Sequence, residues 1–375
     1  MVFVLFSHFS SKAQDPTYSQ YNLNQLYYNP AYTGYHGGYQ FTATYRNLWP
    51  NVRGKSFPQG PLGTYHAFFD CFVGRNYYHA GIGAFAMEDV EGEGYLKTST
   101  FGISYAQHLP KIGGYKSDIS PRLKLSLGFK GYISSISIDW DKLVFTDQLN
   151  LDYGIIGGTN SSFNHTGTFR KMVGDMDAGL LLLNNFMGQN KWYNEVGFSI
   201  AHILAPSISL MGSTEDNIRL PRKYLVSYRS TVDIAKGKLF MGPTLLFENQ
   251  KKFFELNAGL DFFVKVQKDN RVIPLTLSIM NRITIVQHKT NTSAIIVGIS
   301  HKGILGKKNA PVYTIGFAAD FPYMGLGMQT AGAYELSIGI VIPQKGGNGF
   351  SQCPYSTFDH SKQMNQYYKP KVKNR

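Results

Sequence analysis

Hydrophobic and polar side chains alternate along much of the chain with a period of two. In the segment 121–133, Leu123, Leu125, Leu127 and Phe129 fall on one face, while two lysines and a serine fall on the other. This pattern predicts a β-strand with one apolar and one polar face. Fourteen segments with such alternating or small/apolar patterning lie near 39–46, 64–73, 79–87, 96–107, 121–133, 176–184, 193–202, 222–233, 238–248, 253–263, 272–285, 292–301, 312–321 and 332–342.

The succession of strands restricts the fold class. No segment shows the 3.6-residue period of a long amphipathic helix, and strands do not alternate with helices. A β-sandwich, a propeller and an up-and-down barrel remain. A propeller would repeat at a period of about 40 to 50 residues, and no such repeat is visible. We therefore expect an all-β fold, an antiparallel up-and-down β-barrel of about 14 strands, with a soluble secreted sandwich as the alternative.

Composition favours a barrel in a membrane. Tyr, Phe and Gly together make 90 of the 375 residues, and only 16% of the residues are charged. This balance is expected where many strands each present one face to lipid. After the first dozen positions the chain lacks an apolar window long enough for a transmembrane helix, whereas a transmembrane strand needs only about 9 to 11 residues. We predict a transmembrane barrel in contact with outer-membrane lipid.

The predicted connections differ in charge between the two ends of the barrel. Numbered from the first strand, the even connections are short to medium in length and sum to +10, whereas the odd ones, which include the long connection 134–175, sum to −3. Outer-membrane barrels have short periplasmic turns and longer outer loops. The even connections therefore predict a basic periplasmic rim, with candidate residues Lys236, Lys238, Lys265, Lys268, Arg271, Lys302, Lys307 and Lys308.

The scatter of positive charge over turns also argues against nucleic-acid binding. The chain has a net charge of +13, but a nucleic-acid binder concentrates Lys and Arg with aromatic residues on one groove or helix. We expect no nucleic-acid partner.

The first residues resemble an export signal. An apolar run, Val2 to Phe9, precedes the small-x-small site Ser11-Lys12-Ala13, which predicts a signal peptide at 1–13 cleaved before Gln14. An apolar first strand is the alternative. The remaining chain divides into an N-terminal segment, the barrel and a basic C-terminal extension, with predicted bounds 14–38, 39–343 and 344–375. The extension is either a solvated tail or a docking segment for an acidic partner.

Motifs for catalysis or cofactor binding are not found. The chain lacks GxSxG, HExxH, a Walker-type loop and paired CxxC sequences. The stretch from Gly81 to Ala86 begins like a dinucleotide loop but lacks the third glycine. Strand glycines that let a barrel wall bend explain it better. We expect a non-enzymatic protein without a cofactor or metal.

One segment carries a family resemblance. Residues 14–34, QDPTYSQYNLNQLYYNPAYTG, strongly resemble the start of the PorP/SprF family, outer-membrane proteins of the type IX secretion and gliding-motility machinery of Bacteroidetes. Arg46-Asn47-Leu48-Trp49 resembles the R-x-x-W of the family after its first strand. The resemblance covers roughly 14–342, and the chain departs from it in the insertion within 134–175 and in the tail.

The resemblance implies a barrel that helps to secrete substrates or to hold them at the cell surface. The partners that it implies are the C-terminal domain of a secreted substrate, such as a gliding adhesin, and periplasmic components of the secretion system. A fatty-acid-type or passive solute transport barrel is the alternative, because such barrels also have an N-terminal plug.

The motif segment itself predicts such a plug. Asn29-Pro30 favours an extended residue followed by a turn, Gly34 supplies a permissive backbone, and five tyrosines are available to pack under the first strand. A plain periplasmic leader is the alternative. The candidate determinants of family function or partner binding are Gln20, Tyr21, Asn29, Pro30, Gly34, Arg46 and Trp49, and each has a purely structural role as its alternative.

Overall fold

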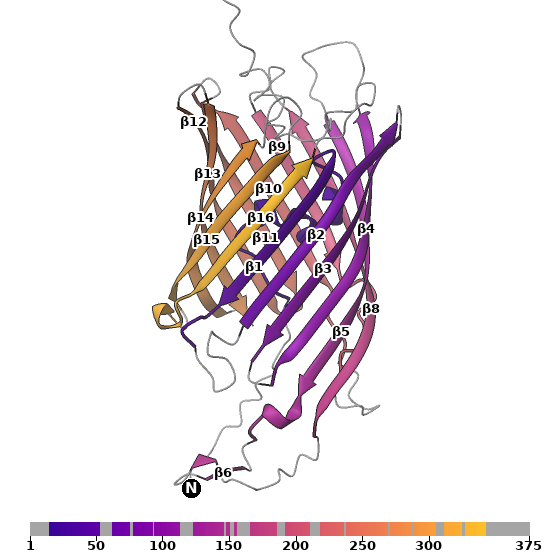
Figure 1. The fold of residues 1–375 in the computed structure, drawn as a ribbon, viewed down its shortest axis with the longest axis vertical. Helices are drawn as coiled ribbons and strands as arrows, with labels where there is room; N and C mark the ends of the chain where they lie inside the picture. The colour runs from indigo at the N-terminus through magenta and orange to yellow at the C-terminus, as the bar shows by residue number, and fades with distance from the viewer. Residues whose placement is uncertain are drawn as a thin grey trace, which may run out of the picture.

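The strands form one closed antiparallel barrel (Figure 1). The computed structural model describes residues 15–52, 62–75, 78–92, 94–112, 123–145, 148–150, 154–155, 166–185, 192–210, 218–235, 238–268, 271–286, 289–304, 311–324 and 327–342. The predicted signal peptide and C-terminal extension lie outside these residues, so both stay predictions.

Fourteen strands make up the barrel wall, and each pairs with its neighbours along the chain. The ring closes where β1 pairs with β16, from Tyr39 opposite Ile342 to Leu48 opposite Ala333. The predicted up-and-down barrel is therefore confirmed. The wall strands are β1 (Tyr39–Leu48), β2 (Leu62–Arg75), β3 (Tyr78–Glu91), β4 (Leu96–Ile112), β5 (Leu123–Asp139), β8 (Thr168–Asn185), β9 (Trp192–Ala201), β10 (Lys223–Asp233), β11 (Leu239–Gln250), β12 (Phe253–Lys268), β13 (Arg271–Val286), β14 (Lys289–Ile304), β15 (Val312–Met324) and β16 (Ala333–Ile342).

Several predicted connections are shorter than expected, two of them as follows. Strand pairing between β5 and β8 continues to Asp139 opposite Thr168, well inside the predicted loop 134–175. The rest of that connection includes the short helix η3 (Trp140–Lys142) and a two-stranded sheet of β6 (Leu149–Asn150) and β7 (Gly154–Ile155). Likewise β12 and β13 meet with only residues 269–270 between them. Both extensions depend on cross-strand hydrogen bonds, which a local sequence window does not reveal.

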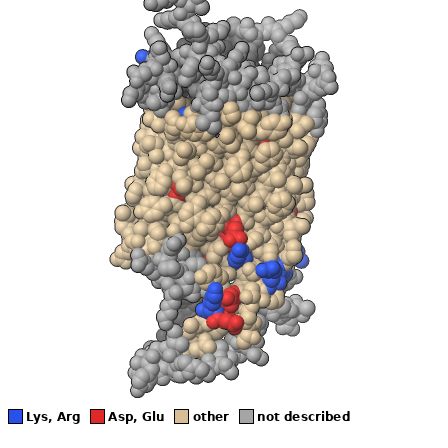
Figure 2. All heavy atoms as spheres, in the orientation of Figure 1, with Lys and Arg blue, Asp and Glu red and all other residues tan. Residues whose placement is uncertain are grey.

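Side chains alternate between lipid and lumen along the strands. On β4, the outward Phe101 and Ile103 are 64% and 66% exposed, whereas Ser104 is only 5% exposed. On β5, Phe129 is 54% exposed and its neighbour Lys130 is buried. An apolar exterior with a polar interior is the arrangement of a transmembrane barrel. The outer face in Figure 2 has a broad band with few charged side chains, and most of its charged side chains gather toward the lower end.

Two strands extend further than the others at one end of the barrel. β5 and β8 project beyond the other strands at the lower end in Figure 1, which we call the hairpin end. β1 begins and β16 ends at the other end, which we call the opposite end. Since the strands alternate in direction, the β1–β2 connection lies at the hairpin end and the β2–β3 connection at the opposite end.

Residues 15–38 lie inside the barrel and are called the plug below. Of its 24 residues, 16 are buried and none is exposed. Its short helical turns are η1 (Tyr21–Leu23), α1 (Gln25–Tyr28) and η2 (Pro30–Tyr32), and one further turn, η5 (Gly327–Thr330), connects β15 to β16. Among the described residues, no helix is both long and apolar enough to cross a membrane.

We expect the Ile103→Arg substitution to destabilise the barrel by about 2–4 kcal/mol, because it places a charge on the lipid-facing side near the middle of a strand. Urea unfolding of the protein in lipid vesicles, followed by the heat-modifiable mobility of the folded barrel, measures this loss. Ile103→Leu is the matched control and should unfold like the wild type. An unchanged midpoint for the arginine variant would show that this face does not meet lipid.

Candidate functional site

Tyrosines form the centre of the plug. Tyr18, Tyr21 and Tyr28 pack with Leu225 and Leu246 of the barrel wall in one buried cluster. The rings of Tyr18 and Tyr27 meet edge to face with their centroids 4.9 Å apart. Such aromatic pairs bury large apolar areas, while each hydroxyl provides a polar atom that can form hydrogen bonds inside the barrel. The tyrosines therefore let one segment match both the apolar and the polar parts of the wall.

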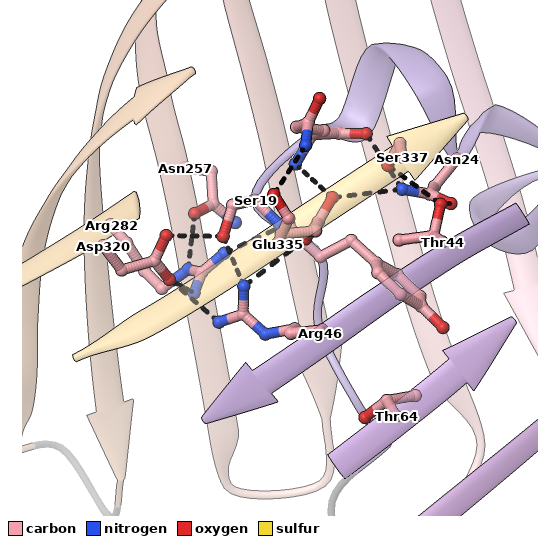
Figure 3. Close-up of polar contacts among 12 residues, drawn as sticks. Ser19, Asn24, Thr44, Arg46, Thr64, Asn257, Arg282, Asp320, Glu335 and Ser337 are labelled. Carbon is pink, nitrogen blue, oxygen red and sulfur yellow. Dashed lines mark hydrogen bonds and ion pairs between the residues drawn. The ribbon is translucent and has the colours of Figure 1, made fainter. Parts of the chain in front are cut away.

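A buried carboxylate at the start of β16 binds the backbone of the plug (Figure 3). Glu335 accepts hydrogen bonds from the Ser19 and Gln20 amides at 2.6 and 3.0 Å, and a third from the Asn24 side chain at 3.2 Å. Its side chain is completely buried. A carboxylate in such a place is stable only when charged or strongly polar groups surround it. The plug supplies these donors with two consecutive backbone amides.

Two arginines of the wall lie beside the carboxylates of Glu335 and Asp320 (Figure 3). Arg46 lies 2.8 Å from Asp320 and 3.4 Å from Glu335. Arg282 lies 2.7 Å from Asp320 and donates to the Tyr18 carbonyl oxygen at 3.1 Å. Ser19 joins the groups, because its hydroxyl accepts from Arg46 and donates to Asp320. Removal of one partner from a buried pair costs about 3–5 kcal/mol, because a charge is then left without a partner.

A second ion pair binds the plug nearer the opposite end. Arg229 on β10 holds Glu195 on β9 with two hydrogen bonds of 2.7 and 2.9 Å. Tyr32 and Tyr35 donate their hydroxyls to the same carboxylate at 2.6 and 3.2 Å. Arg229 also donates to the Asn22 side chain at 2.7 Å. The pair thus holds three plug side chains, two at the carboxylate and Asn22 at the guanidinium.

The plug begins at a third cluster, beside the hairpin end. His202, just after β9, lies 2.8 Å from Asp15 through Nε2 and 2.8 Å from Asp175 through Nδ1. Burial alone would lower the pKa of His202, but the Asp15 and Asp175 carboxylates outweigh it and raise this pKa to about 10. At neutral pH the imidazolium therefore forms charged contacts on both sides. Lys223, 3.8 Å from Asp15, adds a second cation.

The buried charges of the described chain are predominantly acidic. Ten buried acidic side chains face five buried Lys or Arg side chains. The acidic residues are Asp70, Asp89, Asp175, Asp177, Glu195, Glu248, Glu255, Asp261, Asp320 and Glu335, and the basic ones are Arg46, Lys130, Lys223, Arg229 and Arg282. Because the whole chain carries +13, the interior has the opposite sign to the molecule. The plug, whose only acidic residue is Asp15 and which has no Lys or Arg, meets this acidic lining chiefly with neutral donors.

Glycines let the plug backbone touch the wall. Gly34 has a φ of +71°, and its amide donates to the Asp70 carboxylate. A Cβ on Gly81 of β3 would lie 2.0 Å from the carbonyl oxygen of Thr33, closer than any atom tolerates. The prediction that Gly81 lets the wall bend is therefore incomplete, because close approach of the plug requires this glycine. Gly128 and Gly179 serve the plug in the same way near Ala31 and Asn29.

Two small cavities lie between the plug and the wall. Two cavities of about 60 and 50 Å³ lie beside Asn22, Leu23 and Lys302. Cavities of this size are large enough to hold water. Neither cavity is wide enough for a polypeptide.

The predicted motif residues meet around the plug. Gln20 and Tyr21 are buried, and Gln20 also donates to the Glu335 carbonyl oxygen. Asn29 donates to the carbonyl oxygens of Leu180 and Phe198, while its own Oδ1 caps the turn that Pro30 begins. Each of these contacts holds the segment against the wall, as do those of Gly34 and Arg46 above.

Trp49 stands apart from the plug. It follows β1 at the hairpin end, has a φ of +56°, and its backbone amide donates to the Gly332 carbonyl oxygen at 2.7 Å. This bond joins the β1–β2 connection to the β15–β16 connection. Of the seven motif candidates, Trp49 is thus the one placed at the rim.

The predicted basic rim is only partly described. Lys238 is exposed beside β11, as expected of a turn residue. Lys265 and Lys268 belong to β12, Arg271 belongs to β13, and Lys302 belongs to β14 and lines both cavities. These four positions are strand residues and not loop residues, because the strands extend into the predicted connections. Lys236, Lys307 and Lys308 lie outside the described residues.

Sequence reasoning missed the acidic partners of the motif. Glu335 and Asp320 carry the plug contacts, yet neither was a candidate. The sequence feature that could have identified them is an acidic residue at an inward position of an otherwise apolar strand. Tyr334-Glu335-Leu336 is an example. Among the described residues, no group of three or more His, Cys, Asp or Glu side chains is arranged to hold a metal ion.

Comparison with known proteins gives one sequence match and several fold matches. The family model described as "Type IX secretion system membrane protein PorP/SprF" matches residues 10–340. No curated protein sequence matches the chain. A Pseudomonas aeruginosa FadL homologue has 11% identity and a TM-score of 0.40, covering 84% of this chain and 90% of that one. The β domain of the Bordetella autotransporter BrkA has 10% identity and a TM-score of 0.38, covering 82% of this chain and 100% of that one.

We expect Glu335→Gln to loosen the plug by about 1.5–3 kcal/mol, the range for hydrogen bonds to a charged group. The amide would present a donor where four donors already converge, from Ser19, Gln20, Asn24 and Arg46. Limited chymotrypsin digestion of the detergent-solubilised protein should then cut the plug at its tyrosines, which are protected in the wild type. Glu88→Gln, which removes an exposed ion pair to Lys97, should leave digestion unchanged. Equal protection of both variants would contradict the anchoring role of Glu335.

We expect Gly81→Ala to displace the plug, since its new methyl group would overlap the Thr33 carbonyl. Hydrogen exchange of the amides from Tyr28 to Tyr35 should become faster, because their protection depends on that contact. Gly131→Ala is the matched control, because a Cβ on Gly131 meets nothing within 4 Å. Identical exchange in the two variants would refute the close contact.

Proposed function

Because the chain belongs to the PorP/SprF family of type IX secretion system membrane proteins, we propose that it holds secreted substrates at the cell surface and docks periplasmic components of the system. The clients of this proposal carry C-terminal domains of the kind that the family recognises, with gliding adhesins among them. The barrel acts without an enzymatic step. It is an outer-membrane protein whose outer wall meets lipid.

The filled lumen is the observation that carries this proposal. The plug is buried over most of its length and is bound at three separate ion clusters. Two cavities beside the plug, of about 60 and 50 Å³, are too small in volume to hold a polypeptide. A secreted client therefore meets the outer wall, the rims or the connections, and this supports an anchor more than a conduit. The same filling disfavours passive solute transport in this state.

The ends of the barrel suggest an orientation. Strands β1 and β16 begin and end at the opposite end, and the predicted connections on that side sum to +10. We assign that end to the periplasm, where a basic rim attracts acidic partners over a distance of several ångströms. The hairpin end then faces outward, where a surface client is held.

The test is a pull-down of the tagged protein from native outer membrane after brief cross-linking, in mild detergent, with partners identified by mass spectrometry. We expect a large secreted protein, cross-linked through its C-terminal domain, together with periplasmic secretion components. Glu88→Gln, which changes a surface charge only, should recover the same partners. A barrel that is recovered alone and conducts ions in a planar bilayer would contradict the proposal and favour the transport alternative.

A further inference from the structure

Strand β8 is much longer than its partner on one side. Along β5 it pairs over nearly its whole length, from Lys124 opposite Leu183 to Asp139 opposite Thr168. Along β9 it pairs only from residue 178 to residue 185. Residues 168–177 therefore project past the end of β9 at the hairpin end, as Figure 1 shows for the lower part of β8.

The projecting part of β8 presents an open backbone edge. The last backbone contact on the β9 side is the Ile203 amide, which donates to the Met176 carbonyl oxygen at 2.9 Å. Backbone groups of a strand point alternately to its two neighbours, so those of Gly174, Met172 and Arg170 point to the same side as those of Met176. Among the described residues, no backbone group pairs with these three on that side. Such an edge is a template for another strand.

The open edge lies beyond the apolar belt. The register aligns Gly174 with Ile133 and Phe101, which are outward and apolar. One row further toward the hairpin end, Met172 aligns with Ser135 and Ser99. The next strand continues this row with Glu88, which forms an exposed ion pair with Lys97. In the row of Met172, the neighbouring strands thus carry polar outward residues in place of apolar ones. The edge from this row onward therefore meets water and proteins in water.

Two exposed side chains stand on this edge. Met172 is 69% exposed, more than any other large hydrophobic side chain of the described residues. Arg170, two residues away on the same face, is exposed and forms no ion pair within the described part of the chain. An arginine in this position recognises a carboxylate through two parallel hydrogen bonds. The edge therefore offers amides, one apolar contact and one unpaired guanidinium.

The described part of the neighbouring connection, residues 202–210 and 218–222, does not close the edge with its backbone. Ser207 and Arg219 form a bridge of their own, and Lys171 reaches this bridge with its side chain, donating to the Ser207 hydroxyl and the Ser209 carbonyl oxygen at 3.3 and 3.1 Å. The contact is thus made by one flexible side chain from the other face of β8. The outward face, with Arg170 and Met172, stays free of it.

We propose that the β8 edge from Thr168 to Gly174 binds an extended, acidic segment of a secreted client by strand addition. This inference rests on the proposed function, since the client is the protein held at the surface. The added strand pairs with the backbone of Arg170 and Met172 and carries a carboxylate opposite Arg170 and an apolar side chain against Met172. A second copy of this chain fits less well, because residues 168–174 contain no acidic residue and would leave both guanidinium groups unpaired.

The experiment places the photo-crosslinking residue p-benzoylphenylalanine at Thr168, whose side chain is exposed on the same face. Irradiation of cells that carry this variant should yield an adduct with a secreted protein. The same residue at Met328, which is 62% exposed at the same end of the barrel, is the matched control and should yield none. An adduct with residues 203–221 of the same chain, or with a second copy, would overturn the proposal.

A second substitution tests the backbone pairing itself. Met172→Pro in the Thr168 crosslinking variant removes one edge amide but leaves the β5 pairing, because the Met172 amide points away from β5. The adduct should fall at least about tenfold, while Met172→Ala, which keeps the amide, should retain most of it. Arg170→Glu should also reduce the adduct, and Arg170→Lys should reduce it less. Heat-modifiable mobility verifies that each variant is folded.

The outcomes separate this inference from the proposed function. If the pull-down recovers a secreted protein but Thr168 yields no adduct, or Met172→Pro leaves the adduct unchanged, strand addition at β8 is wrong and the anchor stands. If neither experiment recovers a secreted protein, both the anchor and the strand addition are wrong.

Discussion

Charged side chains inside the barrel need partners, and the rest of the structure depends on how they find them. Most side chains of the plug are buried against the wall, and two of the cavities beside it measure about 60 and 50 Å³. A buried carboxylate without a partner would cost several kcal/mol, on the order of the whole stability of a domain. The wall meets this constraint with its own arginines and lysines, and the plug completes the remaining hydrogen bonds. Plug and wall thus share one network of contacts.

Most of the ion pairs join one wall strand to another. Asp320 lies between Arg46 and Arg282, Glu195 meets Arg229, and Lys223 meets Glu248 at 2.5 Å. These pairs fix the inner surface of the barrel through contacts between strands. The plug then adds backbone amides, side-chain amides and tyrosine hydroxyls, which are neutral donors, and Asp15 is its one acidic exception. A neutral segment can dock on such a lining without bringing further charges to compensate.

The sequence predicted the wall better than it predicted the contacts within it. The fourteen predicted segments match the barrel strands because alternation is a local property, readable within a single strand. Arg46 was also a candidate, since it belongs to the family motif. Its partner Glu335 is 289 residues away, and the barrel brings the two together only when β1 closes on β16. The register, which depends on the whole ring, is invisible to a local pattern.

The same limit explains Gly81 and the β8 edge. Gly81 is needed because the Thr33 carbonyl lies against it, a contact between segments that no spacing in the sequence reveals. The first part of β8 falls within the predicted connection 134–175. It was not predicted as a strand, because pairing with β5 continues where the apolar alternation weakens. A barrel of strands of unequal length must leave an open edge wherever one neighbour stops early. With the lumen filled by the plug, such exposed edges and rims are the surfaces on which a partner can be held.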